Sequence, residues 1–234
     1  MAAMTATELD ALWEGIDDQR TRSADLLEGL TPAQWDHPSL CEGWTVRHVA
    51  AHLTLQEQSL GDLLGFVGRH PRMWRHPGLN GTIRESATIV AGELTPDEVV
   101  RRIRAGIGTR RHNAFVTPLE TLTDALVHGQ DVAVPLGLPL EMRPGPSAVA
   151  ATRRWATRRS WLASVNRRLP LDGYCLCATD ADWIRGEGPE VVGPVGAILL
   201  LITGRPAGLD RLSGPGADVL RERLGHRPIR PSGG

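Results

Sequence analysis

The sequence predicts an α+β fold that is mainly helical, with an N-terminal four-helix bundle followed by a smaller C-terminal α/β domain. Up to about residue 140, segments with apolar residues at helical spacing follow one another, each behind a helix-start signal. After Pro170 the pattern changes to short β-prone runs bounded by glycine and proline. A bundle is the natural way to bury several apolar helical stripes. We therefore expect a helical domain over residues 1–142 and an α/β domain over residues 143–234.

Threonines mark most of the helix starts in the N-terminal domain. Thr5 and Glu8 have the spacing of a capping box. Thr31, Thr95 and Thr117 each precede a proline that suits the first turn of a helix. The expected helices run from Thr5 to about Leu30, from Thr31, as one long helix from Thr45 through Leu63, over 82–93, from Thr95 to Ile107 and from Thr117 to Val134, with loops at 37–43 and 67–81.

The C-terminal domain is expected to combine short strands with helices. Its expected elements are a helix over 146–164 that carries Trp155, Trp161 and Leu162, strands at Tyr174–Thr179 and Glu190–Val192, a helix over Val195–Ile202, a short strand at Gly208–Leu212, a helix over Ala217–Leu224 and a disordered tail over 226–234. Cys175 and Cys177 are two residues apart in the first strand. They should therefore point to the same face, poorly placed to pair with each other.

Composition and charge argue against several classes of function. The 234 residues carry a formal net charge of −1 and no block of like charge, so no basic face for nucleic acid is visible. Arginine clusters at 109–112 and 151–159 are interpreted as solvated helix faces in preference to a phosphate-binding patch. The longest apolar run is too short to cross a membrane, and the N-terminus has no signal-peptide pattern. An odd, sparse set of three cysteines favours a reducing, cytoplasmic setting.

The strongest candidates for chemistry lie on two of the expected helices. Asp124 and His128 are four residues apart, which places both side chains on one face, one turn apart. With His52 as a third ligand they would hold one divalent metal ion, zinc in preference, and leave a position open for water or substrate. The alternative is that both histidines are hydrogen-bonded core residues. His48, four residues before His52, could be a ligand instead or as well, and Asp131 could hold His128 through its other ring nitrogen or cap a helix end.

Two segments resemble the mycothiol-dependent maleylpyruvate isomerase family, which belongs to the DinB-like metalloenzyme superfamily. One is Ser39-Leu-Cys-Glu-Gly-Trp-Thr-Val-Arg-His-Val-Ala-Ala-His52-Leu, and the other is Asp124-Ala-Leu-Val-His128-Gly-Gln-Asp131, followed by Pro135-Leu-Gly. The run from Ala178 to Arg205 resembles the smaller C-terminal domain of many members. The resemblance implies a DinB-like bundle whose metal is held by His52, Asp124 and His128, with His48 outside the ligand set. Asp124 stands where the characterised isomerase has glutamate, and the shorter carboxylate shifts the ligand geometry.

The resemblance also implies a function. Mycothiol would be the thiol cofactor, its sulfur binding the open metal position as a thiolate and attacking a small electrophilic substrate, which gives thiol transfer or isomerisation. Arg205 is the candidate catalytic residue of the C-terminal domain, since its planar guanidinium group can bind a carboxylate or phosphate through two hydrogen bonds. The alternative is an arginine that is favoured near a helix C-terminus by the helix dipole.

Other interpretations stay open at this point. The chain could be a non-enzymatic small-ligand-binding module on the same scaffold, or a metal-dependent hydrolase, for which Glu57 is poorly phased as the base. Cys41 is interpreted as a small buried turn residue in preference to an acidic thiol, and Trp44 as packing against the start of the His52 helix. The oligomeric state is open, with a homodimer among the options.

Overall fold

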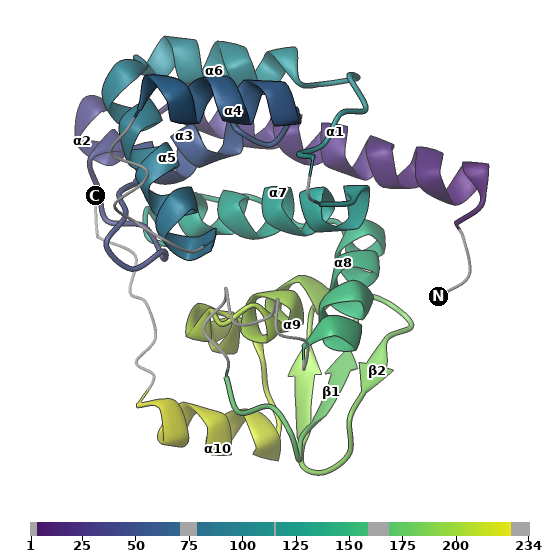
Figure 1. Ribbon diagram of the computed structural model, residues 1–234. Coiled ribbons are helices and arrows are strands. Elements are labelled where there is room, and N and C mark those ends of the chain that lie inside the picture. The colour runs from purple at the N-terminus through teal and green to yellow at the C-terminus, as the bar shows by residue number, and fades with distance from the viewer. Residues whose placement is uncertain (1–3, 71–78, 115, 159–168, 226–234) are drawn as a thin grey trace. The chain divides into compact units, whose positions relative to one another are not determined.

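The computed structural model describes residues 4–70, 79–114, 116–158 and 169–225 (Figure 1). Its contacts divide the chain into two compact units, one up to Leu140 and one from Glu141 onward. The described part of the first unit is built of helices, and the second combines helices with a three-stranded sheet. The predicted fold class, a mainly helical α+β protein with an N-terminal bundle, is therefore confirmed.

The helices of the N-terminal unit begin where capping chemistry predicts. They are α1 (Ala6–Glu28), α2 (Pro32–Trp35), α3 (Val46–Leu53), α4 (Leu60–Arg69), α5 (Leu79–Glu93), α6 (Pro96–Ala105) and α7 (Pro118–Ala133). At the start of α1, the Thr5 hydroxyl accepts a hydrogen bond from the Glu8 backbone N–H (3.2 Å), and the Glu8 carboxylate accepts one from the Thr5 N–H (2.8 Å). Prolines occupy the first turns of α2, α6 and α7. The helix starts predicted from the threonines are confirmed.

Residues 45–63, expected as one long helix, form two helices joined by a turn. The Thr54 hydroxyl donates to the Ala51 carbonyl (2.7 Å), a local bond at the end of α3 that competes with continuation of the helix. Helix α4 begins afresh behind Ser59, whose hydroxyl accepts from the Asp62 backbone N–H (3.2 Å) while the Asp62 carboxylate accepts from the Ser59 N–H (3.0 Å). The Ser59 capping box therefore marks the start of a second helix, which the apolar periodicity alone does not reveal.

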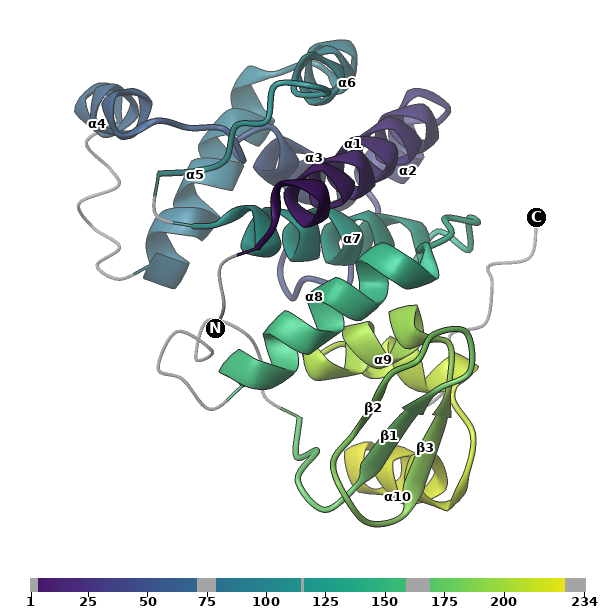
Figure 2. The same ribbon diagram turned by 90° about the vertical axis from the view of Figure 1, so that its right-hand side faces the viewer.

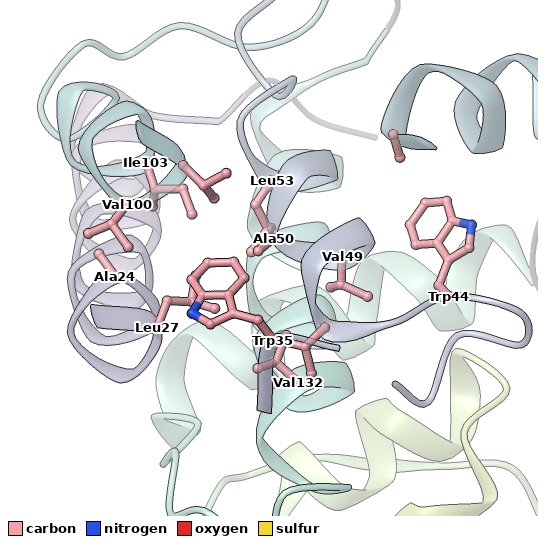
Figure 3. Packing of buried hydrophobic residues seen from close by; sticks show 13 residues of the cluster. Ala24, Leu27, Trp35, Trp44, Val49, Ala50, Leu53, Val100, Ile103 and Val132 are labelled. Atoms are coloured by element: carbon pink, nitrogen blue, oxygen red, sulfur yellow. The ribbon is translucent and has the colours of Figure 1, made fainter. Parts of the chain in front are cut away.

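Helix α3 is central to the N-terminal unit. It packs against α5, α6 and α7, while α1 packs along α6 and α7 (Figures 1 and 2). Figure 3 shows the apolar side chains gathered between these helices, with Trp35 beside Leu27 of α1 and Val132 of α7. The buried members of this cluster are Ala24, Leu27, Trp35, Trp44, Val46, Val49, Ala50, Leu53, Ala87, Val99, Val100, Ile103 and Val132. The shared core fixes α3 and α7 relative to each other.

The C-terminal unit places helices around a small mixed sheet. Its elements are α8 (Pro144–Thr157), β1 (Cys175–Ala178), β2 (Ile184–Arg185), β3 (Glu190–Gly193), α9 (Val195–Ile202), the 3₁₀ helix η3 (Pro206–Arg211) and α10 (Pro215–Leu224). The strand order is β2-β1-β3, with β1 antiparallel to β2 and parallel to β3. Helix α9 packs against α8, η3 and β1, and α10 packs against β3 (Figure 2). Leu176 and Val191 are fully buried and mark the covered face of the sheet.

One expectation for this unit is wrong. Residues 208–212, expected as a strand, lie mostly in η3. Pro206 fixes φ in the first turn, and the Gly208 N–H donates to the Arg205 carbonyl (3.1 Å), the i to i+3 bond of a 3₁₀ helix. Gly208 also lies tight against α9, because a Cβ there would be 2.4 Å from the Ala197 carbonyl oxygen.

Strand β2 has no counterpart in the sequence-based expectation, because two residues are too few to show alternation. Trp161, Leu162 and the tail 226–234 lie outside the described residues. In the part of the chain that the structure describes, no helix combines the length and the apolar character needed to span a bilayer.

Leu27→Ala should lower the free energy of unfolding by about 2–5 kcal/mol, because truncation of a buried core side chain leaves a cavity. The Leu27 side chain is 1% exposed, whereas that of Leu64 is 65% exposed. Leu64→Ala is therefore the matched control, and it should change the free energy by less than about 0.5 kcal/mol. Urea denaturation followed by circular dichroism measures both. Equal effects of the two substitutions would contradict the assigned core.

Candidate metal centre

Two packed helices supply the candidate ligands. Helix α3 carries His52, α7 carries Asp124 and His128, and the two helices lie against each other. Val49 and Ala50, just before His52, are fully buried, which fixes the rotation of α3 about its own axis. Helix α7 is buried along most of its length. The ligand positions are therefore held by regular, core-packed helices.

The structure brings His52, Asp124 and His128 together. Asp124 Oδ2 lies 3.3 Å from His52 Nε2, and Asp124 Oδ1 lies 3.1 Å from His128 Nε2. The imidazole rings meet edge to face with centroids 4.8 Å apart, and the Trp44 ring lies 5.7 Å from that of His52. One ligand atom from each of the three residues lies within 4.8 Å of the other two. The side chains are 16%, 34% and 13% exposed, so a small ligand can reach them.

Asp131 supports His128 from behind and is fully buried. Its Oδ2 lies 2.8 Å from His128 Nδ1 and accepts a hydrogen bond from the Cys41 thiol (3.1 Å). This contact orients the imidazole so that Nε2 faces Asp124. Cys41, His128 and Asp131 also form a group with ligand atoms within 4.8 Å, but there the histidine nitrogen and the carboxylate already bind each other. Asp131 could support His128 or cap a helix end, and its contact with His128 Nδ1 matches the first role.

Gln56 is a site residue that the sequence reasoning missed. Its Nε2 donates to Asp124 Oδ2 (2.9 Å), and its side chain is buried. Gln56 follows His52 by four residues, the same spacing that links Asp124 to His128. That spacing was the available signal. Gln56 lies in the turn after α3, where the bond to Asp124 fixes the carboxylate orientation.

His48 has a different task from His52. Its Nδ1 accepts from the Thr45 backbone N–H (3.3 Å) and lies 2.8 Å from the Thr45 hydroxyl, at the start of α3. Burial, followed by the charges of Arg47 and Arg84, lowers the pKa of His48, which favours the neutral ring that such an acceptor needs. His48 therefore caps the helix, and His52, one turn later, faces α7.

Arg205, the candidate catalytic residue, belongs to the C-terminal unit between α9 and η3. Its Nη1 donates to the Thr203 carbonyl (2.7 Å), and its backbone N–H donates to the Leu200 carbonyl (2.8 Å). These are contacts of an arginine at a helix C-terminus. The catalytic role of Arg205 stays a prediction.

The charges in the cluster are coupled. Burial opposes ionisation of Asp124, but the charges and hydrogen bonds of His128 and His52 outweigh it and hold the pKa of that carboxyl well below its usual range. Burial likewise opposes protonation of His128, but Asp124, with the hydrogen bonds of Asp131 and Cys41, raises the His128 pKa well above its ordinary value. The favoured state is a carboxylate beside a protonated imidazole. A divalent ion at this place would replace that proton.

The donor set fits a divalent cation. Two imidazole nitrogens and one carboxylate form a ligand set typical of catalytic zinc sites, which keep a fourth position open. Ligand atoms at about 2.0–2.1 Å from a tetrahedral zinc ion are about 3.3 Å apart. Asp124 presents a different oxygen to each histidine, Oδ2 at 3.3 Å from His52 and Oδ1 at 3.1 Å from His128, and each separation is by itself close to that value. The supporting contact from Asp131 to His128 is of the kind that metal-binding histidines usually make.

A cavity of about 50 Å³ is lined by Gln56, Glu57 and Arg20 among others. Arg20 is buried, and its Nη1 lies 2.9 Å from Glu57 Oε1 and donates to the Gly106 carbonyl (2.6 Å). Glu57 Oε1 also accepts from the Thr109 hydroxyl (2.7 Å). The Glu57 carboxylate is thus bound by Arg20 and Thr109, and not by the candidate metal ligands.

Comparison with known proteins points to one family. Residues 16–107, from within α1 to just beyond α6, match the family model described as the mycothiol maleylpyruvate isomerase N-terminal domain. The crystal structure of the mycothiol-dependent maleylpyruvate isomerase matches with a TM-score of 0.55 at 14% identity, covering 89% of this chain and 93% of that chain. A histidine-to-alanine mutant of the isomerase matches with a TM-score of 0.56 at 16% identity and the same coverage. No curated protein sequence matches this chain. The resemblance stated from the sequence is confirmed.

Asp131→Asn should weaken zinc binding by about 10–100-fold, because the carboxylate that orients His128 and raises its basicity is lost. Cys41→Ser is the matched control, since a serine hydroxyl can still donate to Asp131, and it should leave the zinc affinity nearly unchanged. Competition with a chromophoric chelator measures both. Unchanged affinity in a folded Asp131→Asn variant would show that Asp131 does not support the ligand.

Zinc affinity should fall as the pH falls through the neutral range. The Asp124 pKa is lowered, so this ligand stays ionised, whereas the His128 pKa is raised, so zinc must displace a proton from that ring. Below the raised pKa, the apparent affinity drops about tenfold per pH unit for the one proton displaced. Calorimetry in buffers of different ionisation enthalpy counts that proton. An affinity that is constant from pH 8 to pH 6 would contradict the assignment.

Proposed function

We propose that this chain, whose residues 16–107 carry a mycothiol maleylpyruvate isomerase N-terminal domain, is a metal-dependent transferase or isomerase that uses mycothiol as its thiol and acts on a small electrophilic substrate. The observation that carries the proposal is the convergence of His52, Asp124 and His128, with ligand atoms within 4.8 Å of one another. The family and the fold support the thiol chemistry, because both the matched domain and the similar solved structures are named for it.

His52, Asp124 and His128 would hold the metal, with zinc as the proposed ion. When bound, such an ion lowers the pKa of a thiol or water at the open position, which makes a nucleophile available at neutral pH. Gln56 fixes the Asp124 carboxylate through a 2.9 Å hydrogen bond. Asp131 holds the His128 ring by its Nδ1, so that Nε2 faces the site. The buried Trp44 ring beside His52 shields that side of the cluster from water.

Metal-dependent hydrolysis is less well supported, because it needs a base near the ligands. Glu57, the carboxylate considered for that role, is paired with Arg20 (2.9 Å) and accepts from Thr109 (2.7 Å). A non-enzymatic ligand-binding module on this scaffold would not need three metal-ligand atoms held together. Metal content and thiol consumption distinguish the three functions.

Protein purified without a polyhistidine tag should contain close to one metal ion per chain, and His128→Ala should remove it while the helical content is retained. His48→Ala is the matched control, because His48 caps α3 and faces Thr45, and it should keep the metal. Elemental mass spectrometry measures the metal, and circular dichroism measures the helices. The absence of metal from the wild type after incubation with zinc would refute the proposed site.

The thiol part of the proposal has its own readout. With a panel of small electrophiles, the metal-loaded protein should accelerate consumption of mycothiol, and His128→Ala should lose that acceleration. Full metal occupancy with no thiol consumption, together with hydrolysis of an ester or amide, would favour the hydrolase instead.

A further inference from the structure

Cys175 and Cys177 place two thiols side by side on β1, in the C-terminal unit. Their Sγ atoms are 3.4 Å apart, and both residues are free and half-buried. Leu176 between them is fully buried, on the opposite face of the strand. The expectation that the two cysteines share a face is therefore confirmed, and neither belongs to the candidate metal-ligand groups of the described residues.

The strand that carries the thiols is held on both sides. Strand β1 is central, and Cys177 pairs with Ile184 of β2 and with Val192 of β3, while Cys175 pairs with Glu190. Neighbours in register share a face of a sheet. On the thiol face Ile184 is 58% exposed, Val192 is half-buried and Glu190 is exposed, so the face is open to reagents. The ladder fixes the backbone of Cys175 and Cys177, so both side chains leave the strand on the same face.

The spacing selects what the pair can bind. A disulfide needs a sulfur–sulfur distance of about 2.05 Å, far below the observed spacing. A tetrahedral zinc ion with bonds of about 2.3 Å holds two thiolates about 3.8 Å apart, and a linear two-coordinate copper(I) ion holds them farther apart still. A pyramidal trivalent centre has bond angles closer to a right angle and brings its sulfurs closer together. The 3.4 Å spacing of Cys175 and Cys177 fits that geometry best.

We propose that Cys175 and Cys177 form a chelating dithiol site for trivalent arsenic, as in organic arsenoxides. Binding is a condensation. Two As–S bonds form, the As=O bond breaks, and the two thiol protons leave with the oxygen as one water molecule. No electron is transferred, so no oxidant or reductant is required.

The protonation state of Cys177 agrees with this chemistry. Burial raises the pKa of the Cys177 thiol to about 11, assisted by the hydrogen bond with Cys175 and the negative charge of Glu190. A neutral thiol at Cys177 reacts slowly with alkylating agents, because the thiolate is the nucleophile. It still supplies its proton to the water that the condensation releases.

The test uses the full-length, reduced chain and phenylarsine oxide. Mass spectrometry under native conditions should show one arsenical per chain, and titration of free thiols in denaturant should show two of the three cysteines protected. Cys175→Ser and Cys177→Ser should each weaken binding by about 100-fold or more, because one thiol loses the chelate advantage. Cys41→Ser is the matched control, with one cysteine removed and the pair intact, and should bind as the wild type does.

Three results would overturn the proposal. The first is equal arsenical affinity of the wild type and a folded Cys177→Ser variant, since a single thiol would then suffice. The second is a disulfide between the two cysteines in protein purified without reductant and stable to mild reduction, since no dithiol would be available. The third is zinc binding at this pair, measured in the His128→Ala background, that competes out the arsenical at equal concentration.

Discussion

The packing of α3 against α7 is the constraint on which the candidate metal centre depends. His52 and Asp124 are 72 positions apart in the chain, and only this contact brings their side chains to 3.3 Å. The contact is fixed by apolar neighbours, because Val49 and Ala50 are buried directly beside His52. Helices hold ligand positions more rigidly than loops do, since each ligand position is set by a backbone ladder of hydrogen bonds. The polar cluster thus takes its geometry from the hydrophobic core.

Burial of the polar residues around Asp124 is costly, and one connected network of hydrogen bonds and charge contacts compensates for it. Gln56 donates to one carboxylate oxygen of Asp124, and His128 contacts the other. Asp131 is fully buried, and its Oδ2 atom contacts both His128 and Cys41. Such a network is less stabilising than apolar packing of equal volume, because each charge loses its hydration. A buried charged network of this kind fits a role in function, as the perturbed pKa values of Asp124 and His128 also do.

The two units present different donor atoms. The N-terminal cluster offers imidazole nitrogen and carboxylate oxygen, which suit a borderline ion such as zinc. The pair Cys175–Cys177 offers two sulfurs 3.4 Å apart on a strand, which suits a softer centre with a narrow bond angle. Because softness and spacing both differ, the two sets of donors are expected to select different ions.

The sequence by itself determined what depends on residues within about one helical turn. It predicted the capped helix starts at Thr5 and Thr117 and the shared face of Asp124 and His128, because both follow from local spacing. The tertiary structure decided the rest. The contact between α3 and α7 brought His52 to Asp124, and Gln56 joined the cluster from the turn after α3. These contacts join residues about 70 positions apart, so no local pattern encodes them. The Ser59 capping box and the contact of His48 with Thr45 are local, but the apolar periodicity does not show them.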